Sequence, residues 1–220
     1  GCGIYRSVWL HMASAVSAAP HGIRAVTAAL DGSSAVVEVS TALTGTADSV
    51  TYELADAEGQ VLATAEGLGT VQLAANGITP WTPETPALYT LRVNVTANGT
   101  ADTAEQRIGI RTIQVSSKTG LLLNGQPRTM KGGCIHHDLG ILGAADHAAA
   151  ERRRIRLMKE SGFDAIRAAH NPFSPAFLDA CDELGMLVVE EAFDEWVMGR
   201  TSFGLHVTFE QCWEKDLEDM

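Results

Sequence analysis

The chain has 220 residues, of which 45% are hydrophobic and 20% are charged, a composition typical of globular proteins and long enough for about two domains. Its formal net charge of −11 disfavours nucleic acid or an anionic membrane surface as a partner and suits a neutral ligand such as a sugar. No apolar stretch reaches transmembrane length, and the chain opens with neither an initiating Met nor a secretory signal pattern. We therefore expect no nucleic-acid and no membrane partner. The sequence leaves the compartment open, with the cytoplasm slightly favoured and the bacterial periplasm or secretion as alternatives.

The first half of the chain alternates apolar and polar residues in short segments separated by Gly, Asp and Asn. The segments expected to be strands are 23–30, 35–41, 50–54, 61–65, 70–73 and 88–95. Asp31-Gly32 is a hairpin-turn signal between the first two. This all-β pattern, with a length of about a hundred residues, predicts an immunoglobulin-like β-sandwich over residues 13–113.

Three apolar runs in the second half end abruptly in polar side chains that can perform chemistry. The runs cover residues 130–135, 163–169 and 186–189, and they lead into His136-His137-Asp138, His170-Asn171 and Glu190-Glu191, with Asp194-Glu195-Trp196 close behind. Buried parallel strands are near-continuous apolar runs, and in a β/α barrel the working residues lie where the strands end. The pattern predicts the start of an active-site face.

Helix signals separate these runs. Asp146 can cap a helix that extends to about Ser161, while Ser174 followed by proline opens a second helix that Gly185 ends. Strands alternating with helices indicate a βαβ progression. A doubly wound nucleotide-binding fold is disfavoured because no glycine-rich phosphate motif follows the first strand. Three strands leave a parallel sheet incomplete, so we expect the chain to be part of a longer protein whose barrel continues after residue 220.

The triplet His136, His137 and Asp138 could bind a metal, but adjacent residues on a strand point to opposite sides and do not easily converge on one ion. At a strand end, one of these histidines can instead hydrogen-bond a neutral, hydroxyl-rich ligand. The alternative is a histidine whose ring is satisfied by loop carbonyls. The position at a strand end favours ligand binding.

Arg167 interrupts an apolar strand, where an unpaired charge is costly, so it must meet a carboxylate. Glu190 or Glu191 on the next strand is the expected partner. The pair is either purely structural or serves to orient site residues. His170, three residues later, is the stronger candidate for ligand contact.

Glu190 and Glu191 are not expected to act together as a catalytic acid and base. Glycoside hydrolysis needs two carboxylates that face each other at roughly 5 to 9.5 Å, whereas neighbours on one strand face opposite ways. Asp194, Glu195 and Trp196 add acceptors and an aromatic surface, the combination that binds a sugar's hydroxyls and its apolar C–H face. Ordinary packing is the alternative for Trp196.

Successive motifs together resemble glycoside hydrolase family 2, and the His-His-Asp-Leu-Gly and Glu-Ala-Phe-Asp-Glu-Trp forms are most similar to its β-galactosidase branch. The motifs, in chain order, are Gly3-Ile-Tyr-Arg-Ser-Val-Trp-Leu10, Thr79-Pro-Trp-Thr-Pro-Glu-Thr-Pro-Ala-Leu-Tyr89, Gly109-Ile-Arg-Thr112, Leu123-Asn-Gly-Gln-Pro127, His136-His-Asp-Leu-Gly140, Ile166-Arg-Ala-Ala-His-Asn-Pro172 and Glu191-Ala-Phe-Asp-Glu-Trp196. The resemblance implies that residues 1–12 end a jelly-roll sugar-binding domain, that 13–113 form the immunoglobulin-like sandwich, and that 114–220 form the first three βα units of a TIM barrel.

The resemblance also implies roles for single residues. The family's sugar-holding histidines match His136 and His170, and its arginine that supports the catalytic carboxylates matches Arg167. The glutamate matching Glu195 binds magnesium in some members together with a histidine two residues later, but that position is Val197 here. The resulting expectation is no required cofactor, with magnesium at Glu195 as the one metal to consider. The complete set of expected substrate-binding residues is His136, His170, Asn171, Asp194 and Trp196, with His137, Asp138, Arg167 and Glu191 as supporting residues.

The family's two catalytic glutamates come from later barrel strands, so none is expected within residues 1–220. The resemblance implies a parent protein that cleaves terminal β-D-galactosides with retention, and a chain that is inactive alone. β-Glucuronidase or β-mannosidase activity of the same family is one alternative, and a non-catalytic carbohydrate-binding module is another. A glucuronidase needs an added basic group for the substrate carboxylate, and Arg167 is the only internal candidate apparent in the sequence. The sequence leaves open whether the protein forms a homo-oligomer.

Overall fold

A computed structural model describes residues 3–220 of the chain. The residues divide into two compact units, one formed by Trp9–Thr129 and the other by the described part of Gly1–Val8 together with Met130–Met220. Among the described residues, no helix combines the length and the apolar character needed to cross a membrane.

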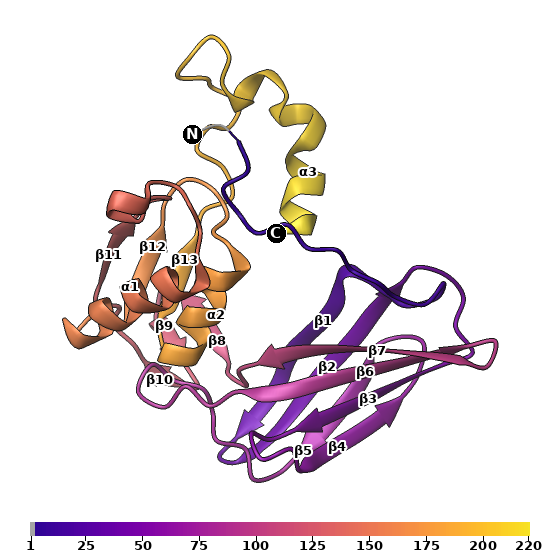
Figure 1. Cartoon of the computed structure of the whole chain (residues 1–220). Helices are drawn as coiled ribbons and strands as arrows, with labels where there is room; N and C mark the ends of the chain where they lie inside the picture. Colours follow the sequence, from indigo (N-terminus) through magenta and orange to yellow (C-terminus); the bar gives the residue numbers. More distant parts are fainter. Residues whose placement is uncertain (1–2) are drawn as a thin grey trace. The chain divides into compact units, whose positions relative to one another are not determined.

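The first unit is a sandwich of two antiparallel sheets (Figure 1). One sheet has the order β1-β2-β5 and the other β4-β3-β6-β7. The strands are β1 (Ala18–Asp31), β2 (Ser34–Leu43), β3 (Ser49–Ala55), β4 (Val61–Glu66), β5 (Val71–Ala75), β6 (Tyr89–Ala97) and β7 (Thr100–Ile108). Alternating residues of both sheets form the core, among them Val37, Leu54, Leu73 and Leu91, each at most 1% exposed. The predicted sandwich strands are therefore all present, and β7 is an additional one.

The Thr79–Tyr89 motif belongs to this sandwich. Trp81 is fully buried and its backbone N–H donates to the carbonyl of Ile110, while the Tyr89 hydroxyl accepts from the backbone N–H of Thr79 at 2.8 Å. These contacts tie the connection before β6 to the end of β7. The motif therefore has a structural role in the sandwich.

A small antiparallel sheet follows, made of β8 (Ile113–Ser116), β9 (Gly120–Leu123) and β10 (Gln126–Pro127). Asn124 and Gly125 between β9 and β10 both have positive φ, as a tight hairpin turn requires. The Asn124 side chain donates to the carbonyl of Trp81 and accepts from the N–H of Thr112. The hairpin is thereby bonded to the sandwich unit, and the domain boundary at residue 113 stays a prediction.

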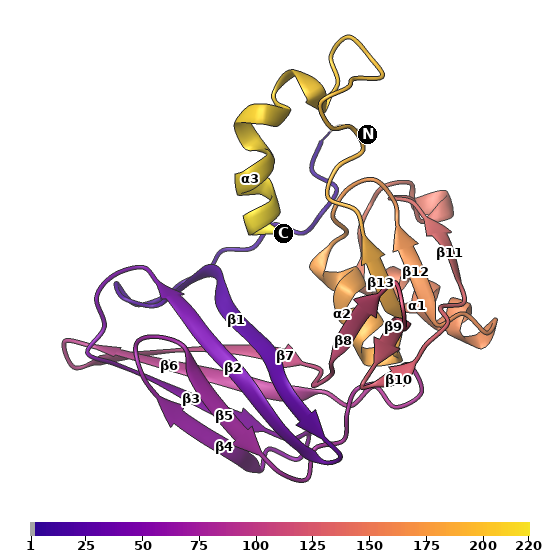
Figure 2. The ribbon, with the colours of Figure 1, turned by 180° about the vertical axis from the view of Figure 1, so that it is seen from behind.

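The second unit contains a parallel sheet with the order β11-β12-β13 (Figures 1 and 2). Its elements are β11 (Gly132–Ile135), α1 (Ala148–Glu160), β12 (Ala165–Ala168), α2 (Pro175–Leu184), β13 (Leu187–Glu190) and α3 (Phe209–Asp219), with short 3₁₀ turns η1 (Gly140–Leu142) and η2 (Leu205–Val207). Figure 1 shows α1 and α2 together in front of the sheet, and in Figure 2 the strands lie in front of these helices. The predicted βαβ progression is confirmed.

Helix α2 follows its sequence signals closely. Ser174 is the N-cap, with its hydroxyl accepting from the Phe177 N–H, a proline occupies the first turn, and Gly185 ends the helix in the left-handed conformation with φ 76°. Helix α1 differs from its prediction. His147, and not Asp146, is the residue before the helix, and it makes no side-chain capping bond. Asp146 instead donates its backbone N–H to the carbonyl of Tyr5.

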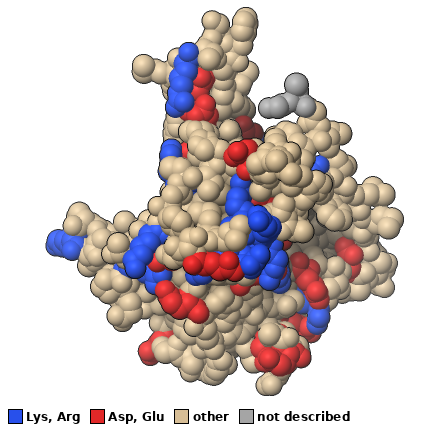
Figure 3. Space-filling view, turned by 60° about the vertical axis from the view of Figure 1, so that its left-hand side comes forward, with Lys and Arg blue, Asp and Glu red and all other residues tan. Residues whose placement is uncertain are grey.

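Both helices pack on one face of the sheet through a shared apolar cluster. Ile155 of α1, Phe177 of α2 and Ile166 of β12 are each at most 1% exposed within it. The outer surface of this unit is charged, with ion pairs such as Arg156–Glu160 on α1 and Arg152–Glu183 between α1 and α2. Basic and acidic side chains accordingly lie next to one another on the face drawn in Figure 3.

Candidate functional site

The carboxyl ends of β12 and β13 border a cleft of about 530 Å³. Side chains from the strand ends and from the segment after β13 line it. They are Arg167, His170, Glu190, Glu191, Ala192, Phe193, Asp194, Trp196, Arg200, Leu217 and Met220. The sequence-predicted residues Arg167, His170, Glu191, Asp194 and Trp196 therefore meet at one place, as expected for the strand ends of a barrel.

The parallel register explains which side chains face the cleft. Cys134, Arg167 and Val189 lie side by side in the register of β11, β12 and β13, and all three are exposed. The neighbouring residue Ile166 points the other way and is buried under the helices. Glu191, two residues after Val189, continues this row and is half-buried, and Glu190 also reaches the cleft.

Arg167 pairs with Glu191, one of the two partners expected for it. Its Nε and Nη2 lie 2.7 and 2.6 Å from Oε1 of Glu191, and its Nη1 lies 3.2 Å from the Cys134 sulfur. The other oxygen of Glu191 accepts from the backbone N–H of His170 at 2.7 Å. This N–H and the Arg167 guanidinium lower the pKa of Glu191, so the carboxylate stays ionised and fixed in orientation.

His170 has a positive φ of 81°, a conformation that residues other than glycine adopt only at a cost of about 1–3 kcal/mol. The bond from its N–H to Glu191 helps hold it there. Its Nδ1 lies 3.2 Å from Oδ1 of Asp194, and its ring centroid is 5.0 Å from that of His136. The strain at His170 thus accompanies a cluster of imidazole and carboxylate groups.

Glu190 also lines the cleft but has other partners than Glu191. Its Oε1 accepts from the backbone N–H of Phe173 at 2.5 Å, and its Oε2 is buried without a hydrogen-bond partner in the described structure. Burial raises the pKa of Glu190, the opposite of the shift at Glu191. Both residues line the cleft, so the prediction that these two neighbours face opposite ways stays a prediction.

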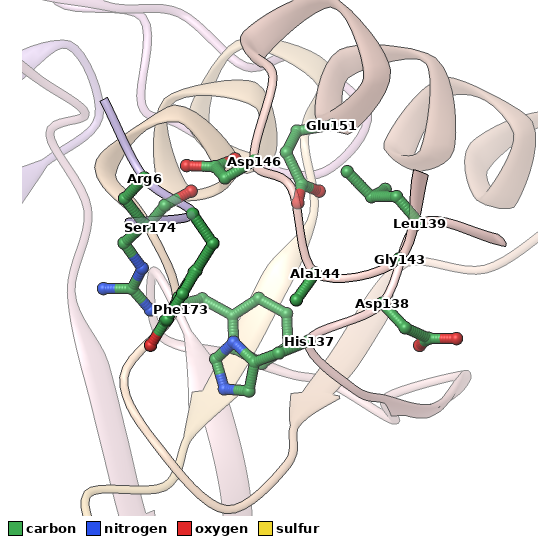
Figure 4. A pocket seen from close by; sticks show the side chains of 11 residues that line it. Arg6, His137, Asp138, Leu139, Gly143, Ala144, Asp146, Glu151, Phe173 and Ser174 are labelled. Carbon is green, nitrogen blue, oxygen red and sulfur yellow. The ribbon is translucent and has the colours of Figure 1, made fainter. Parts of the chain in front are cut away.

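Three further expected residues lie away from the cleft. His137 stacks on Phe173 at 4.1 Å, and its Nε2 is 3.1 Å from the carbonyl of Asn171, whose side chain is exposed. Burial lowers the pKa of His137. The carbonyl of Asp138 accepts from Arg154. His137 and Asp138 line a second pocket of about 20 Å³, where Figure 4 shows them with Arg6, Asp146 and Glu151.

The chain is similar to known proteins along nearly its whole length. The family model described as "Glycosyl hydrolases family 2" matches residues 16–111, and "Glycosyl hydrolases family 2, TIM barrel domain" matches 113–216. A curated beta-galactosidase of Bacteroides ovatus is 36% identical over 100% of this chain. The chain belongs to glycosyl hydrolase family 2. The predicted fold, an immunoglobulin-like sandwich followed by the start of a TIM barrel, is confirmed with it.

Other family 2 relatives carry different names. A putative beta-glucuronidase of Formosa agariphila is 31% identical over 99% of the chain. A solved family 2 member from Bacteroides cellulosilyticus superposes with a TM-score of 0.89 at 34% identity, covering 99% of this chain and 31% of that one. The chain spans only 28% and 22% of the lengths of the Bacteroides and Formosa relatives. The relatives are named for different substrates, so membership of the family does not by itself identify the substrate.

The residues around Glu195 do not fit a magnesium site of the family. Glu195 is 7% exposed, its Oε1 accepts from the backbone N–H of Arg200 at 3.0 Å, and its Oε2 lies 3.2 Å from Nδ1 of His206. Both carboxylate oxygens thus have protein partners. Among residues 3–220, no three His, Cys, Asp or Glu side chains gather as a metal ion would require.

Arg200 and His206 were not predicted from the sequence. Arg200 lines the cleft, with Nη1 3.2 Å from Oδ1 of Asp194 and Nη2 3.2 Å from the Asp194 carbonyl. Both residues lie in a segment without a periodic pattern. The one signal for Arg200 is a basic residue placed shortly after two acidic residues in a glycine-containing loop. Trp196 was expected and is 62% exposed, with its ring 5.7 Å from that of Phe209.

Proposed function

We propose that the protein containing this chain is a retaining glycosidase that hydrolyses terminal β-D-galactosides, and that residues 1–220 supply the sandwich scaffold and part of the sugar pocket. The observation that carries the proposal is the connected cluster of Arg167, Glu191, His170 and Asp194 at adjacent strand ends. The identity to the Bacteroides ovatus beta-galactosidase along the whole chain supports the substrate.

The cluster has the chemistry that a sugar requires. A hydroxyl group both donates and accepts hydrogen bonds; the carboxylates of Glu191 and Asp194 accept, and the imidazole of His170 can do either. The His136 ring, with its centroid 5.0 Å from that of His170, lies next to the cluster. The exposed face of Trp196 offers an apolar surface for the C–H groups of the sugar ring. Arg167 neutralises Glu191 and keeps it in place, so that the acceptors are oriented before the ligand arrives.

The bond-breaking groups are expected from later barrel strands. In a retaining glycosidase one glutamic acid protonates the leaving oxygen and the other forms a covalent glycosyl intermediate, with the two carboxyl groups about 5 to 5.5 Å apart. The role of this chain is then to hold the sugar and to support those carboxylates. We expect residues 1–220 alone to hydrolyse no aryl β-galactoside above a blank.

One observation favours β-glucuronidase activity as a second candidate. Arg200 lines the cleft, and although it pairs with Asp194 its side chain is 66% exposed, so it offers a second basic group besides Arg167. An arginine can bind a substrate carboxylate with two parallel hydrogen bonds. A solved Ruminococcus gnavus β-glucuronidase in complex with D-glucuronic acid has a TM-score of 0.72 at 28% identity over 78% of this chain.

The deciding experiment compares aryl β-D-galactoside, β-D-glucuronide and β-D-mannoside as substrates of the full-length protein. We expect kcat/KM for the galactoside to exceed the other two by at least about 100-fold. A preference for the glucuronide that Arg200→Gln abolishes would replace the proposal with the second candidate. Saturable galactose binding by residues 1–220, with no hydrolysis by the full-length protein, would indicate a carbohydrate-binding module.

A further inference from the structure

The segment between β13 and α3 carries six residues of the cleft, among them Asp194, Trp196 and Arg200, without a strand or an α-helix to hold them. Only the short turn η2 interrupts it, and in Figures 1 and 2 it extends beyond the ends of the strands. Long segments of this kind in compact domains are usually functional or disordered. Something other than backbone ladders must therefore fix its shape.

Glu195 is the buried charge of this segment. One of its oxygens accepts from the N–H of Arg200, five residues on, and the other lies 3.2 Å from Nδ1 of His206, beyond the loop. A carboxylate that is 7% exposed is tolerated only when it is paired and hydrogen-bonded. These two contacts close residues 195–206 into a ring.

The glycines of the segment fit the same arrangement. A Cβ at Gly204 would collide with the Glu195 carboxylate, and one at Gly199 would collide with the His206 imidazole. Neither glycine has a positive φ, so space and not backbone conformation is what requires glycine there. The backbone therefore closes directly onto the Glu195–His206 pair at two points.

We propose that Glu195 and His206 form a clamp that positions the β13–α3 segment for sugar binding, at the glutamate that, by the family resemblance, binds magnesium in some members. The inference rests on the proposed function. Because Glu195 stands between Asp194 and Trp196, fixing its carboxylate determines that Asp194 faces His170 and that Trp196 lies against Phe209. Both residues act through their neighbours, as positioning residues, and the segment needs no divalent cation at Glu195.

The test uses the full-length protein with variants His206→Ala, His206→Gln and Gly204→Ala. Lys215→Ala is the matched control, since Lys215 pairs with Asp219 on the surface of α3 and does not line the cleft. We expect His206→Ala and Gly204→Ala to lower kcat/KM for an aryl β-galactoside by about 10- to 100-fold, mostly through KM. His206→Gln keeps a hydrogen-bond donor and should recover most of the loss, while the control stays at the native value.

Two results would overturn the clamp. One is an unchanged KM in both His206→Ala and Gly204→Ala, with melting temperatures showing that the variants fold. The other is loss of activity and of thermal stability on EDTA treatment, restored by MgCl₂ in the native protein but not in Glu195→Gln, which would make Glu195 a metal ligand. We expect EDTA and MgCl₂ to leave both quantities unchanged.

Failure of the proposed function is distinguishable from failure of the clamp. If the native protein hydrolyses none of the aryl glycosides, the substrate assignment falls, and the clamp is judged by amide hydrogen exchange of residues 191–208. Faster exchange there in His206→Ala than in Lys215→Ala supports it, and equal exchange refutes it.

Discussion

The two faces of the β11–β13 sheet are built from alternate residues of the same short strands, but one face packs against helices and the other borders the cleft. The face under α1 and α2 carries Ile166 and Ala168, which are at most 1% exposed, whereas the opposite face carries Arg167 and Cys134. Residues that stabilise the sheet and residues that line the cleft therefore alternate along β12. At the end of β13 both Glu190 and Glu191 line the cleft, yet burial raises the pKa of Glu190 while the His170 N–H and Arg167 lower the pKa of Glu191.

The largest expected effect comes from Arg167 on the cleft face. In the full-length protein, Arg167→Ala should lower kcat/KM for the preferred aryl glycoside by about 100-fold or more, because Glu191 and through it His170 lose their orientation. Arg156→Ala, which removes an exposed helix pair, is the control and should change nothing measurable. An Arg167→Ala enzyme with native kinetics would show that the ion pair is purely structural.

The helix-covered face should respond in stability instead. Ile166→Ala removes a side chain that is 1% exposed and should destabilise the protein by about 2–5 kcal/mol in urea unfolding. The fraction that remains folded should keep its kcat/KM. A large loss of specific activity in fully folded Ile166→Ala would mean that the two faces are not independent.

Local signals in the sequence predicted much of this arrangement. Ser174, the following proline and Gly185 set the limits of α2, and the structure places them as N-cap, first turn and left-handed C-cap. The strand-end positions of Arg167, His170 and Glu191 followed from apolar runs that end in polar groups. These features depend on residues near each other in the chain, which is why a single sequence contains them.

What escaped prediction depends on distant partners. Strand β7, with the sequence TADTAEQRI, is a mostly exposed strand at the edge of its sheet and so has no apolar run to indicate it. The choice between Glu190 and Glu191 as the partner of Arg167 required the register of β12 and β13. The contact between His206 and Glu195 depends on how the loop between them folds, and no local signal in the sequence indicates that fold.

The start of α2 should contribute a smaller amount of stability to the covered face. Ser174→Ala removes the hydroxyl that accepts from Phe177 and should cost about 1 kcal/mol, measured by urea unfolding. Ser174→Asp, which keeps a capping oxygen, should retain most of the stability. An equal loss in both variants would place the effect in the packing of the buried Ser174 side chain and not in the cap.

The smallest expected effect is also the one that tests the division of Glu190 from Glu191 most directly. The folded state raises the pKa of Glu190 above its ordinary 4.5, so the folded protein holds the Glu190 proton more tightly than the unfolded chain does. The contribution of Glu190 to stability is therefore present below pH 4.5 and is lost as pH rises through the raised pKa. The folded state lowers the pKa of Glu191, so its contribution is present above pH 4.5 and is lost as pH falls through the lowered value. Melting temperatures between pH 3 and 8 should therefore show Glu190→Gln gaining on the native protein as pH rises, and Glu191→Gln losing on it. Parallel curves for the two variants would mean that the two carboxyls share one environment, and the opposite pKa shifts at the end of β13 would be wrong.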